Sequence, residues 1–413
     1  MKNKSVLFLC DRYGVPNDAN SICVKNVVCE FQHRGFKVFC IYNSERKNNR
    51  FIEDGISFIG LRFSLYDYMK SICKKNRVVL KAFFYFFSLF RRMFVFFLYP
   101  NVSPLRSLKY TKTAKELIEK EKIGTVIAVY RPFESFFSLF KLKKEFKDEI
   151  FCIAYHLDVL TSPNTKNKWI RKYQQNRGRN VFAKECNEFN MIVLPSVFEG
   201  QNLQCRKIQY ANFPVCNVFD NEKRFDLPYE LDKFNFVYVG TLNSTNRNPE
   251  YTIKLIESLS EKLEKRILFH VWGNIDVGVM KKIQSSNLVK YHGLLEPDSV
   301  MYALKKSDAI VNVSNELTPQ MVPSKIFQYF STRKPILNVI SSEDDCSIAY
   351  FEKYGMSVNL HKKEKFEDNV ELARKFFENI DASNSRIDES FLLKCTPAFF
   401  VDLVETKYNE NNF

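Results

Sequence analysis

The chain has 413 residues, 45% of them hydrophobic, and a formal net charge of +15 at pH 7. This length supports two domains with separate cores, and the composition excludes a disordered or fibrous protein. The eleven cysteines include no Cys-x-x-Cys pair, which argues against a zinc site or a disulfide framework and predicts reduced thiols in a cytoplasmic compartment. The apolar run at residues 6–10 is too short for a signal peptide, and we interpret it as a first strand.

The positive charge is concentrated in two segments. Residues 61–115 contain twelve lysines or arginines and one acid, Asp67, whereas residues 161–184 contain seven basic residues and no acid. This asymmetry predicts one basic surface and a polyanionic partner on that side.

The first forty residues predict the opening of a parallel, doubly wound α/β sheet. An apolar run at 4–10 is followed by helical spacing at 18–34 and a second apolar run at 36–42. The loop 11–18 follows the first strand, at the edge where such sheets bind ligands, so Gly14 and Asn17 are candidate acceptor-side residues. A turn without a ligand is the alternative.

Residues 78–99 form an aromatic segment with ten Phe or Tyr residues between positions 83 and 99. A transmembrane helix would place Arg91 and Arg92 near its centre, where each raises the free energy of membrane insertion by roughly 2.5 to 3.5 kcal/mol. Each Phe lowers this free energy by only about 0.3 to 0.6 kcal/mol. Lys81, Ser88 and Arg92 instead form a narrow polar stripe, which favours a helix in the interface of an anionic membrane. The alternative is a buried helix whose basic side chains reach the solvent.

Two further strands are predicted at 125–130 and 150–155, with a helix at 131–144 between them. His156 and Asp158 follow the second strand at its carboxyl end, where a side chain can reach a ligand, and Asp158 is a further acceptor-side candidate. A structural histidine that caps the loop is the alternative. We expect a basic loop at 161–179, then a helix up to residue 188 and a short strand at 191–194.

The second half repeats the alternation of strands and helices. Residues 207–232 lack periodicity and suit an interdomain connection. Strands are expected at 234–240, 267–272, 288–292, 308–314 and 356–360, helices at 248–264, 301–307 and 366–379, and a terminal helix at 391–408.

The most informative segment of the second half begins at Pro323, which suits a first helical position. Ile326, Phe327 and Phe330 then share a buried face. Ser324 adds a hydroxyl and Lys325 a charge at the amino end of the helix, where an anion is favoured. This pattern predicts a diphosphate site without a glycine-rich loop.

The sequence Pro-Ser-Lys-Ile-Phe-Gln-Tyr at 323–329, followed by Lys-Pro and a strand, resembles the donor-binding helix of GT-B glycosyltransferases of family 4. The resemblance implies two Rossmann-like domains that face each other across a cleft: an acceptor-side domain at 1–214 and a nucleotide-sugar-binding domain at 215–390, with 391–413 crossing back to the first. Gln328 stands where the family has an acid for the ribose. Arg333 stands where the family has a glycine, and the left-handed conformation of a helix cap is about 1 kcal/mol less favourable for arginine than for glycine.

The resemblance also implies roles for individual residues. Gly240, Thr241 and Arg247 match the donor-phosphate loop, although Thr241 replaces a second basic residue of the family. The loops of Gly273 and His292 would flank the base. Further donor-site candidates are Gln320, Ser324, Lys325 and Gln328, with His156 near the donor sugar.

We therefore predict a retaining glycosyltransferase, in which Arg247 and Lys325 stabilise the departing nucleotide diphosphate without a metal or a cofactor. A glycan or lipid-linked saccharide at the inner membrane face is the expected acceptor, in polysaccharide or surface glycan assembly, with the enzyme peripheral to the membrane through residues 78–99. The alternatives are a nucleotide-sugar 2-epimerase of the same fold, a non-catalytic nucleotide-sugar binder, and a nucleic-acid binder. Nucleic acid is not expected, because it would leave the diphosphate segment unexplained.

Overall fold

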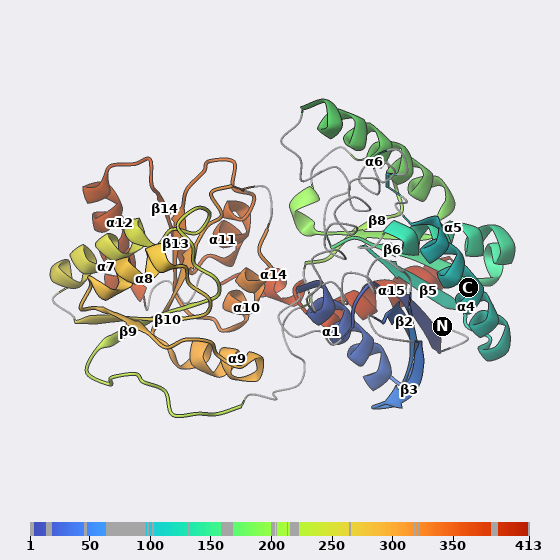
Figure 1. Ribbon diagram of the computed structural model, residues 1–413, viewed down its shortest axis with the longest axis horizontal. Coiled ribbons are helices and arrows are strands. Elements are labelled where there is room, and N and C mark those ends of the chain that lie inside the picture. Colours follow the sequence, from blue (N-terminus) through green and yellow to red (C-terminus); the bar gives the residue numbers. More distant parts are fainter. Residues whose placement is uncertain are drawn as a thin grey trace, which may run out of the picture. The chain divides into compact units, whose positions relative to one another are not determined.

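The computed structural model describes residues 4–13, 19–44, 48–62, 96, 99–100, 103–130, 133–157, 168–199, 203, 205–212, 214, 223–263, 266–317, 319, 322–380 and 387–411. The chain divides into two compact units. The first consists of Met1–Phe213 with Pro397–Phe413, and the second of Pro214–Thr396. The colours of Figure 1 follow the chain through both units.

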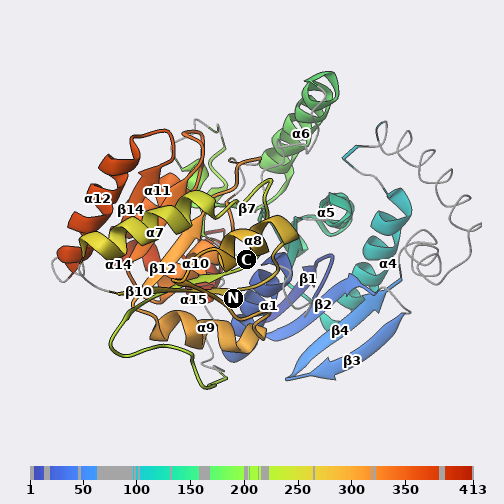
Figure 2. The same ribbon diagram turned by 60° about the vertical axis from the view of Figure 1, so that its left-hand side comes forward.

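The first unit is built on a sheet with the strand order β3-β4-β2-β1-β5-β6-β7-β8, in which β3 alone pairs antiparallel. Figure 2 shows the β3–β4 hairpin at the edge of this sheet. The strands are β1 (Ser5–Leu9), β2 (Lys37–Asn43), β3 (Asn49–Glu53), β4 (Ile56–Leu61), β5 (Thr125–Val129), β6 (Phe151–Tyr155), β7 (Met191–Leu194) and β8 (Ile208–Tyr210). The central strands β1, β5 and β6 are buried at every position, as strands covered on both faces must be.

Helices cover this sheet on both faces. They are α1 (Ala19–His33), α4 (Pro104–Glu121), α5 (Phe133–Phe146), α6 (Lys168–Glu188) and α15 (Pro397–Glu410), with short 3₁₀ turns at Lys147–Glu149 and Ser196–Phe198. One core joins β1, β2 and β5 to α4 and α5. On the other face the terminal helix α15 packs against α1 and against the sheet, where Phe400 lies 4.5 Å from Tyr155 between ring centroids.

The second unit is built on a parallel sheet with the order β11-β10-β9-β12-β13-β14. Its strands are β9 (Phe234–Val239), β10 (Ile267–Trp272), β11 (Val289–Tyr291), β12 (Ala309–Val313), β13 (Ile336–Ile340) and β14 (Ser357–His361). Its helices are α7 (Glu250–Lys262), α8 (Val277–Gln284), α9 (Pro297–Lys306), α10 (Lys325–Ser331), α11 (Ile348–Tyr354), α12 (Phe366–Glu378) and α14 (Glu389–Leu393). One core packs α7, α8 and α12 against one face of the sheet, and α9 lies on the other side (Figure 1).

Several boundaries differ from the sequence-based expectation, and α9 begins at Pro297 where a helix was expected from residue 301. The basic segment expected as a loop up to residue 179 is helical from Lys168, so all of its described part belongs to α6. The terminal helix is two helices, because Pro397 cannot continue α14 and begins α15. The helix expected from Pro323 begins at Lys325, after a turn in which the amide of Ile326 donates to the carbonyl of Pro323.

The aromatic segment 78–99 lies outside the described residues except for Phe96 and Tyr99, so its predicted membrane helix stays a prediction. Across the described part of the chain, no helix combines the length and the apolar composition needed to cross a bilayer.

Candidate functional site

The candidate site of the second unit lies where the winding of its sheet reverses. The chain runs from β9 outward through β10 to β11, then returns to β12 on the other side of β9 and continues to β14. Open α/β sheets bind ligands at such a point, beyond the carboxyl ends of the two central strands. Here these ends are Gly240 after β9 and Ser314–Asn315 after β12.

Arg247 reaches this point through a closed loop. The backbones of Asn243 and Arg247 pair with each other, and the side-chain oxygen of Asn243 accepts hydrogen bonds from the amides of Thr245 and Asn246. The guanidinium Nε of Arg247 then donates to Asn315 Oδ1 at 2.7 Å. The loop after β9 is therefore fastened to the loop after β12, with the arginine at the junction.

Lys325, the first residue of α10, points its ammonium at the end of β9. Its Nζ lies 3.0 Å from the phenol oxygen of Tyr238 and 4.2 Å from the centre of that ring. Tyr329, one turn further along α10, donates its hydroxyl hydrogen to the carbonyl of Val239 at 3.1 Å. Two tyrosines thus fix the approach of α10 to β9, and the lysine occupies the space between them.

Neither cation has an acidic partner among the described residues. The side chains of Lys325 and Arg247 contact tyrosine and asparagine oxygens, and none of the residues that the structure describes forms an ion pair with either of them. Burial, and next the charge of Arg247, lower the pKa of Lys325 well below its ordinary value. Partly buried cations without a counter-charge are costly, and a bound anion with two charges would offset that cost.

Two glycines bring the backbone of neighbouring strands together at this edge. Gly240 has φ 145°, and a Cβ there would lie 3.4 Å from Lys325 Nζ. Gly273, after β10, has φ 135°, and a Cβ there would overlap the carbonyl oxygen of Gly240. The amide of Gly273 in turn donates to the carbonyl of Gly293 at 2.7 Å. A side chain at Gly273 would therefore displace the backbone of Gly240, and one at Gly240 would be strained by the positive φ and would press on Tyr238 and Lys325.

His292 belongs to a hydrogen-bonded chain whose proton positions are fixed by its buried end. Asn235 Nδ2 donates to the carbonyls of Glu230 and Lys233, so its Oδ1 accepts the hydrogen of His270 Nε2 at 3.1 Å. Burial lowers the pKa of His270 to about 4, and its Nδ1 therefore carries a lone pair at neutral pH. That lone pair accepts from His292 Nε2 at 2.9 Å. The half-buried His292 is left with an acceptor at Nδ1.

The remaining donor-side candidates lie near Lys325, with one exception. Ser324 is half-buried and its hydroxyl does not cap α10, and Gln328 is half-buried one turn further on. Thr241 is exposed directly after Gly240, and its carbonyl accepts the Tyr238 hydroxyl at 3.0 Å. Gln320 lies outside the described residues.

The histidine proposed for the first unit is enclosed. His156 is 1% exposed, and its Nε2 lies 2.7 Å from Oε2 of Glu185, which is fully buried on α6. Phe136 and Tyr130 flank the imidazole with ring centroids at 4.7 and 5.9 Å. This arrangement favours the structural histidine over the one that contacts the donor sugar, because no face of the ring is open to a substrate. Gly14, Asn17 and Asp158 lie outside the described residues.

Sequence reasoning missed Tyr238, Tyr329 and Asn315. Tyr238 stands two positions before Gly240 on the same strand, and Tyr329 one turn after Lys325, so both spacings were available as signals. Among the described residues, no group of three or more His, Cys, Asp or Glu side chains is placed to hold a metal ion.

No protein-family model and no curated protein sequence matches the chain. Similarity appears at the level of solved structures. A glycosyltransferase from Rickettsia africae gives a TM-score of 0.56 over 99% of both chains at 12% identity. A putative UDP-N-acetylglucosamine 2-epimerase from Listeria monocytogenes gives 0.56 over 100% of this chain and 98% of that chain at 10% identity. Anabaena HepE in complex with UDP gives 0.52 over 97% and 99% at 12% identity.

The chain has the GT-B fold. Identities of 8 to 12% establish the fold and no more, since one fold carries different activities. In the second unit, Gly240, Arg247 and Lys325 lie at the carboxyl edge of the sheet, where the order of its strands reverses. The GT-B fold expected from the sequence is confirmed.

Proposed function

We propose that the protein is a glycosyltransferase that uses a nucleotide-diphosphate sugar as donor. The observation that carries the proposal is the pair of cations, Lys325 and Arg247, which meet at the end of β9 without a carboxylate partner among the described residues. A diphosphate would supply the missing charge. As the sugar leaves the donor, negative charge grows on the same phosphates, so preorganised cations stabilise the transition state more than the ground state.

The nucleoside is proposed to extend from the diphosphate toward β11. Adjacent strands are separated by about 4.8 Å, so the carboxyl ends of β9 and β11 lie about 10 Å apart, which suits the span from a phosphate to a base. His292 follows β11 and offers an acceptor at Nδ1 for an N–H group of the base. Gln328 accepts a hydrogen bond from a ribose hydroxyl in this arrangement.

The finer features of the proposal are retention of configuration, independence of metal, and a glycan or lipid-linked acceptor at the inner membrane face in surface glycan assembly. The basic excess and the polar stripe of residues 78–99 support the membrane surface as a partner. Flotation with anionic liposomes tests this part: replacing Arg91 and Arg92 by Glu should abolish binding, and unchanged flotation would remove the membrane from the proposal.

A 2-epimerase is the second candidate, because the Listeria protein shares the fold over its whole length. The two activities differ in their need for an acceptor. The deciding experiment follows nucleotide sugars by NMR, with EDTA, with and without an oligosaccharide mixture. A transferase forms a new α- or β-glycoside and nucleoside diphosphate only when acceptor is present, and both products disappear in Lys325→Ala. A C2-inverted sugar formed without acceptor would establish the epimerase instead.

A further inference from the structure

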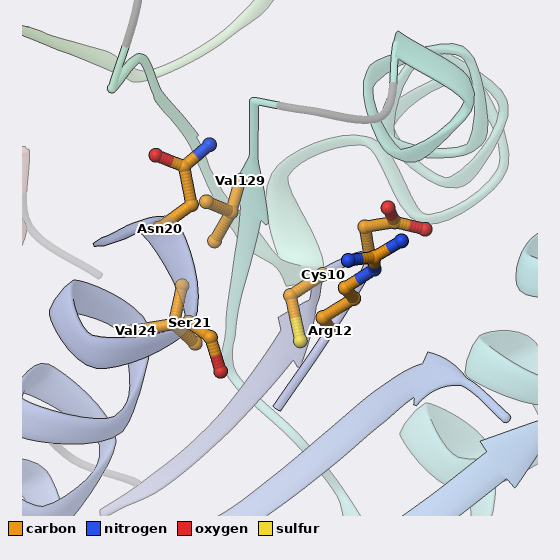
Figure 3. Close-up of a pocket in the computed structure, with 7 residues that line it drawn as sticks. Cys10, Arg12, Asn20, Ser21, Val24 and Val129 are labelled. Carbon is orange, nitrogen blue, oxygen red and sulfur yellow. The ribbon is translucent and has the colours of Figure 1, made fainter. Parts of the chain in front are cut away.

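The first sheet has one edge strand that differs from its neighbours. β3 is the first strand in the order of that sheet, pairs antiparallel with β4, and has no described strand on its outer side (Figure 2). Two strands, β4 and β2, separate it from β1, whose carboxyl end borders the pocket of about 190 Å³ shown in Figure 3. A strand added at the outer side of β3 would therefore leave this pocket to its own ligand.

The geometry of the hairpin decides which backbone groups of β3 face outward. Asp54 and Gly55 form its two-residue turn, with φ values of 49° and 78°, so Glu53 before the turn is hydrogen-bonded to β4. Bonded and non-bonded positions alternate along an antiparallel ladder, so β3 bonds to β4 through its odd-numbered residues. The amides and carbonyls of Arg50 and Ile52 therefore point outward.

The side chains of β3 are exposed and partly apolar. Ile52 is 75% exposed and Phe51 is 40% exposed, with the Phe51 ring stacked on Phe58 at 5.0 Å between centroids. Natural sheets protect their edges with lysine, proline or very short strands. β3 has five residues with neither lysine nor proline, whereas β8 at the other edge has three residues. The outer side of β3 is therefore suited to a further strand.

One register lets β3 pair with a second copy of itself. Two-fold symmetry places each residue opposite one of the same orientation, so an antiparallel pairing is centred on a single residue. When Phe51 is the centre, Arg50 of each copy lies opposite Ile52 of the other, and the two pairs form four hydrogen bonds, two in each pair. A centre at Arg50 or Ile52 would instead require Asn48 or Asp54, which lie outside β3.

The side chains also match in this register. Phe51 faces its symmetry mate at a position where Cα atoms lie about 4.5 Å apart, and each ring already stacks on Phe58 of its own sheet. Asn49 lies opposite Glu53, so an amide meets a carboxylate. Arg50 and Glu53 leave the strand without net charge, so two copies do not repel each other there, although the whole chain carries +15.

We propose that β3 joins two copies of the chain into a two-fold symmetric dimer with one continuous sheet and with Phe51 on the symmetry axis. This pairing is independent of the proposed transferase function, because every group that it uses belongs to the first unit. A pair of five-residue strands buries less than the roughly 1,200 to 2,000 Å² of a stable interface, so the dimer is weak and reversible.

Sedimentation equilibrium of the full chain tests the association, at concentrations from about 1 µM to about 500 µM. The wild type should pass from monomer to dimer in this range. Ile52→Pro removes an outward amide and no bond to β4, as edge positions allow. It deletes two of the four hydrogen bonds, so the dissociation constant should rise by about tenfold or more. Ile52→Val keeps the amide and should associate like the wild type.

Cysteine cross-linking tests the register and does not depend on the folding of Ile52→Pro. With oxidised glutathione, Phe51→Cys should form a covalent dimer, because Cα atoms about 4.5 Å apart fit a disulfide. Glu53→Cys is the matched control: it is exposed on the same strand but lies opposite Asn49, so it should stay at the wild-type background. A monomer at every concentration, equal association of Ile52→Pro and the wild type, or equal cross-linking of both cysteine variants would overturn the proposal.

Discussion

The ammonium nitrogen of Lys325 lies 3.0 Å from the phenol oxygen of Tyr238, which in turn donates its hydrogen to the carbonyl of Thr241 at 3.0 Å. Burial raises the pKa of Tyr238 to about 12, so the phenol stays protonated and keeps both roles. The phenol therefore accepts from the lysine without neutralising it. An ammonium held in this way is ready for an anion, and four of the predictions below concern this site and its surroundings.

Nucleotide binding should be accompanied by proton uptake. The pKa of Lys325 is lowered well below its usual value in the unliganded protein, and a diphosphate beside it would raise that pKa again. Between the two values the free protein holds fewer protons than the complex, so affinity falls as the pH rises through this window. Calorimetry in buffers of different ionisation enthalpy measures the uptake. In Lys325→Arg, whose charge is permanent, the uptake should vanish; proton release on binding in the wild type would contradict this account.

The close approach of two strands predicts unequal effects of two alanine substitutions. Gly273→Ala should lower the free energy of unfolding by about 2 to 4 kcal/mol, because its Cβ would overlap the Gly240 carbonyl. Gly293→Ala is the matched control: its φ is also positive, at 77°, but no atom of the described residues lies within 4 Å of the added Cβ. The free energy of unfolding of Gly293→Ala should be lower than that of the wild type by about 1 kcal/mol. Urea denaturation measures both, and equal losses would argue against the tight backbone contact.

His270 should make stability depend on pH. Its pKa falls from 6.5 to about 4 on folding, mainly by burial and then through His292. As the pH falls, the unfolded chain therefore binds the proton before the folded chain does. The contribution of neutral His270 to the free energy of unfolding, on the order of 3 kcal/mol, is complete above pH 6.5 and is lost as the pH falls toward 4. His270→Gln should flatten the stability profile between these values, whereas His33→Gln, at an exposed position on α1, should leave it unchanged. An unaltered slope in His270→Gln would exclude this role.

Arg34 should fasten the terminal helix. Its Nε pairs with Glu30 at 2.8 Å, and its terminal nitrogens contact Asp402, Glu405 at 3.1 Å and the carbonyl of Ala398 at 3.1 Å. Arg34→Met removes these bonds and should lower the free energy of unfolding by about 1 to 3 kcal/mol. Hydrogen exchange should become faster in α15. Lys407→Met removes an exposed pair on the same helix and should cost less than about 1 kcal/mol; equal effects would count against the fastening role.

The segment that begins at Pro323 shows how much local sequence can predict. Charge, spacing and a proline predicted a helix from Pro323 with Ile326, Phe327 and Phe330 buried. The three side chains are buried as predicted, and the helix begins two residues later, at Lys325. Arg333 has φ 53°, the left-handed conformation expected from its position after the helix. An ion pair with Glu389 at 2.7 Å, which joins positions 56 residues apart, is not readable from this segment.

His156 shows where a local pattern fails. Its position after a strand is compatible with a ligand contact and with a core residue alike, and the decision rests on Glu185, which comes from a distant helix. For the same reason Asn315 was overlooked: it meets Arg247 only when β9 and β12 become neighbours in the sheet. Strand order is a long-range property, and it sets which ends converge.

The most direct measurement is a thermal-shift panel of UDP-, GDP-, ADP- and CMP-sugars on the wild type and on Lys325→Ala. One nucleotide class should raise the melting temperature of the wild type, because a ligand that binds only the folded state stabilises it. The variant should lose this shift while its unliganded melting temperature stays equal or rises, since a poorly solvated ammonium has been removed. The absence of a shift with every nucleotide sugar, or an equal shift in the variant, would contradict the claim that Lys325 binds the donor diphosphate.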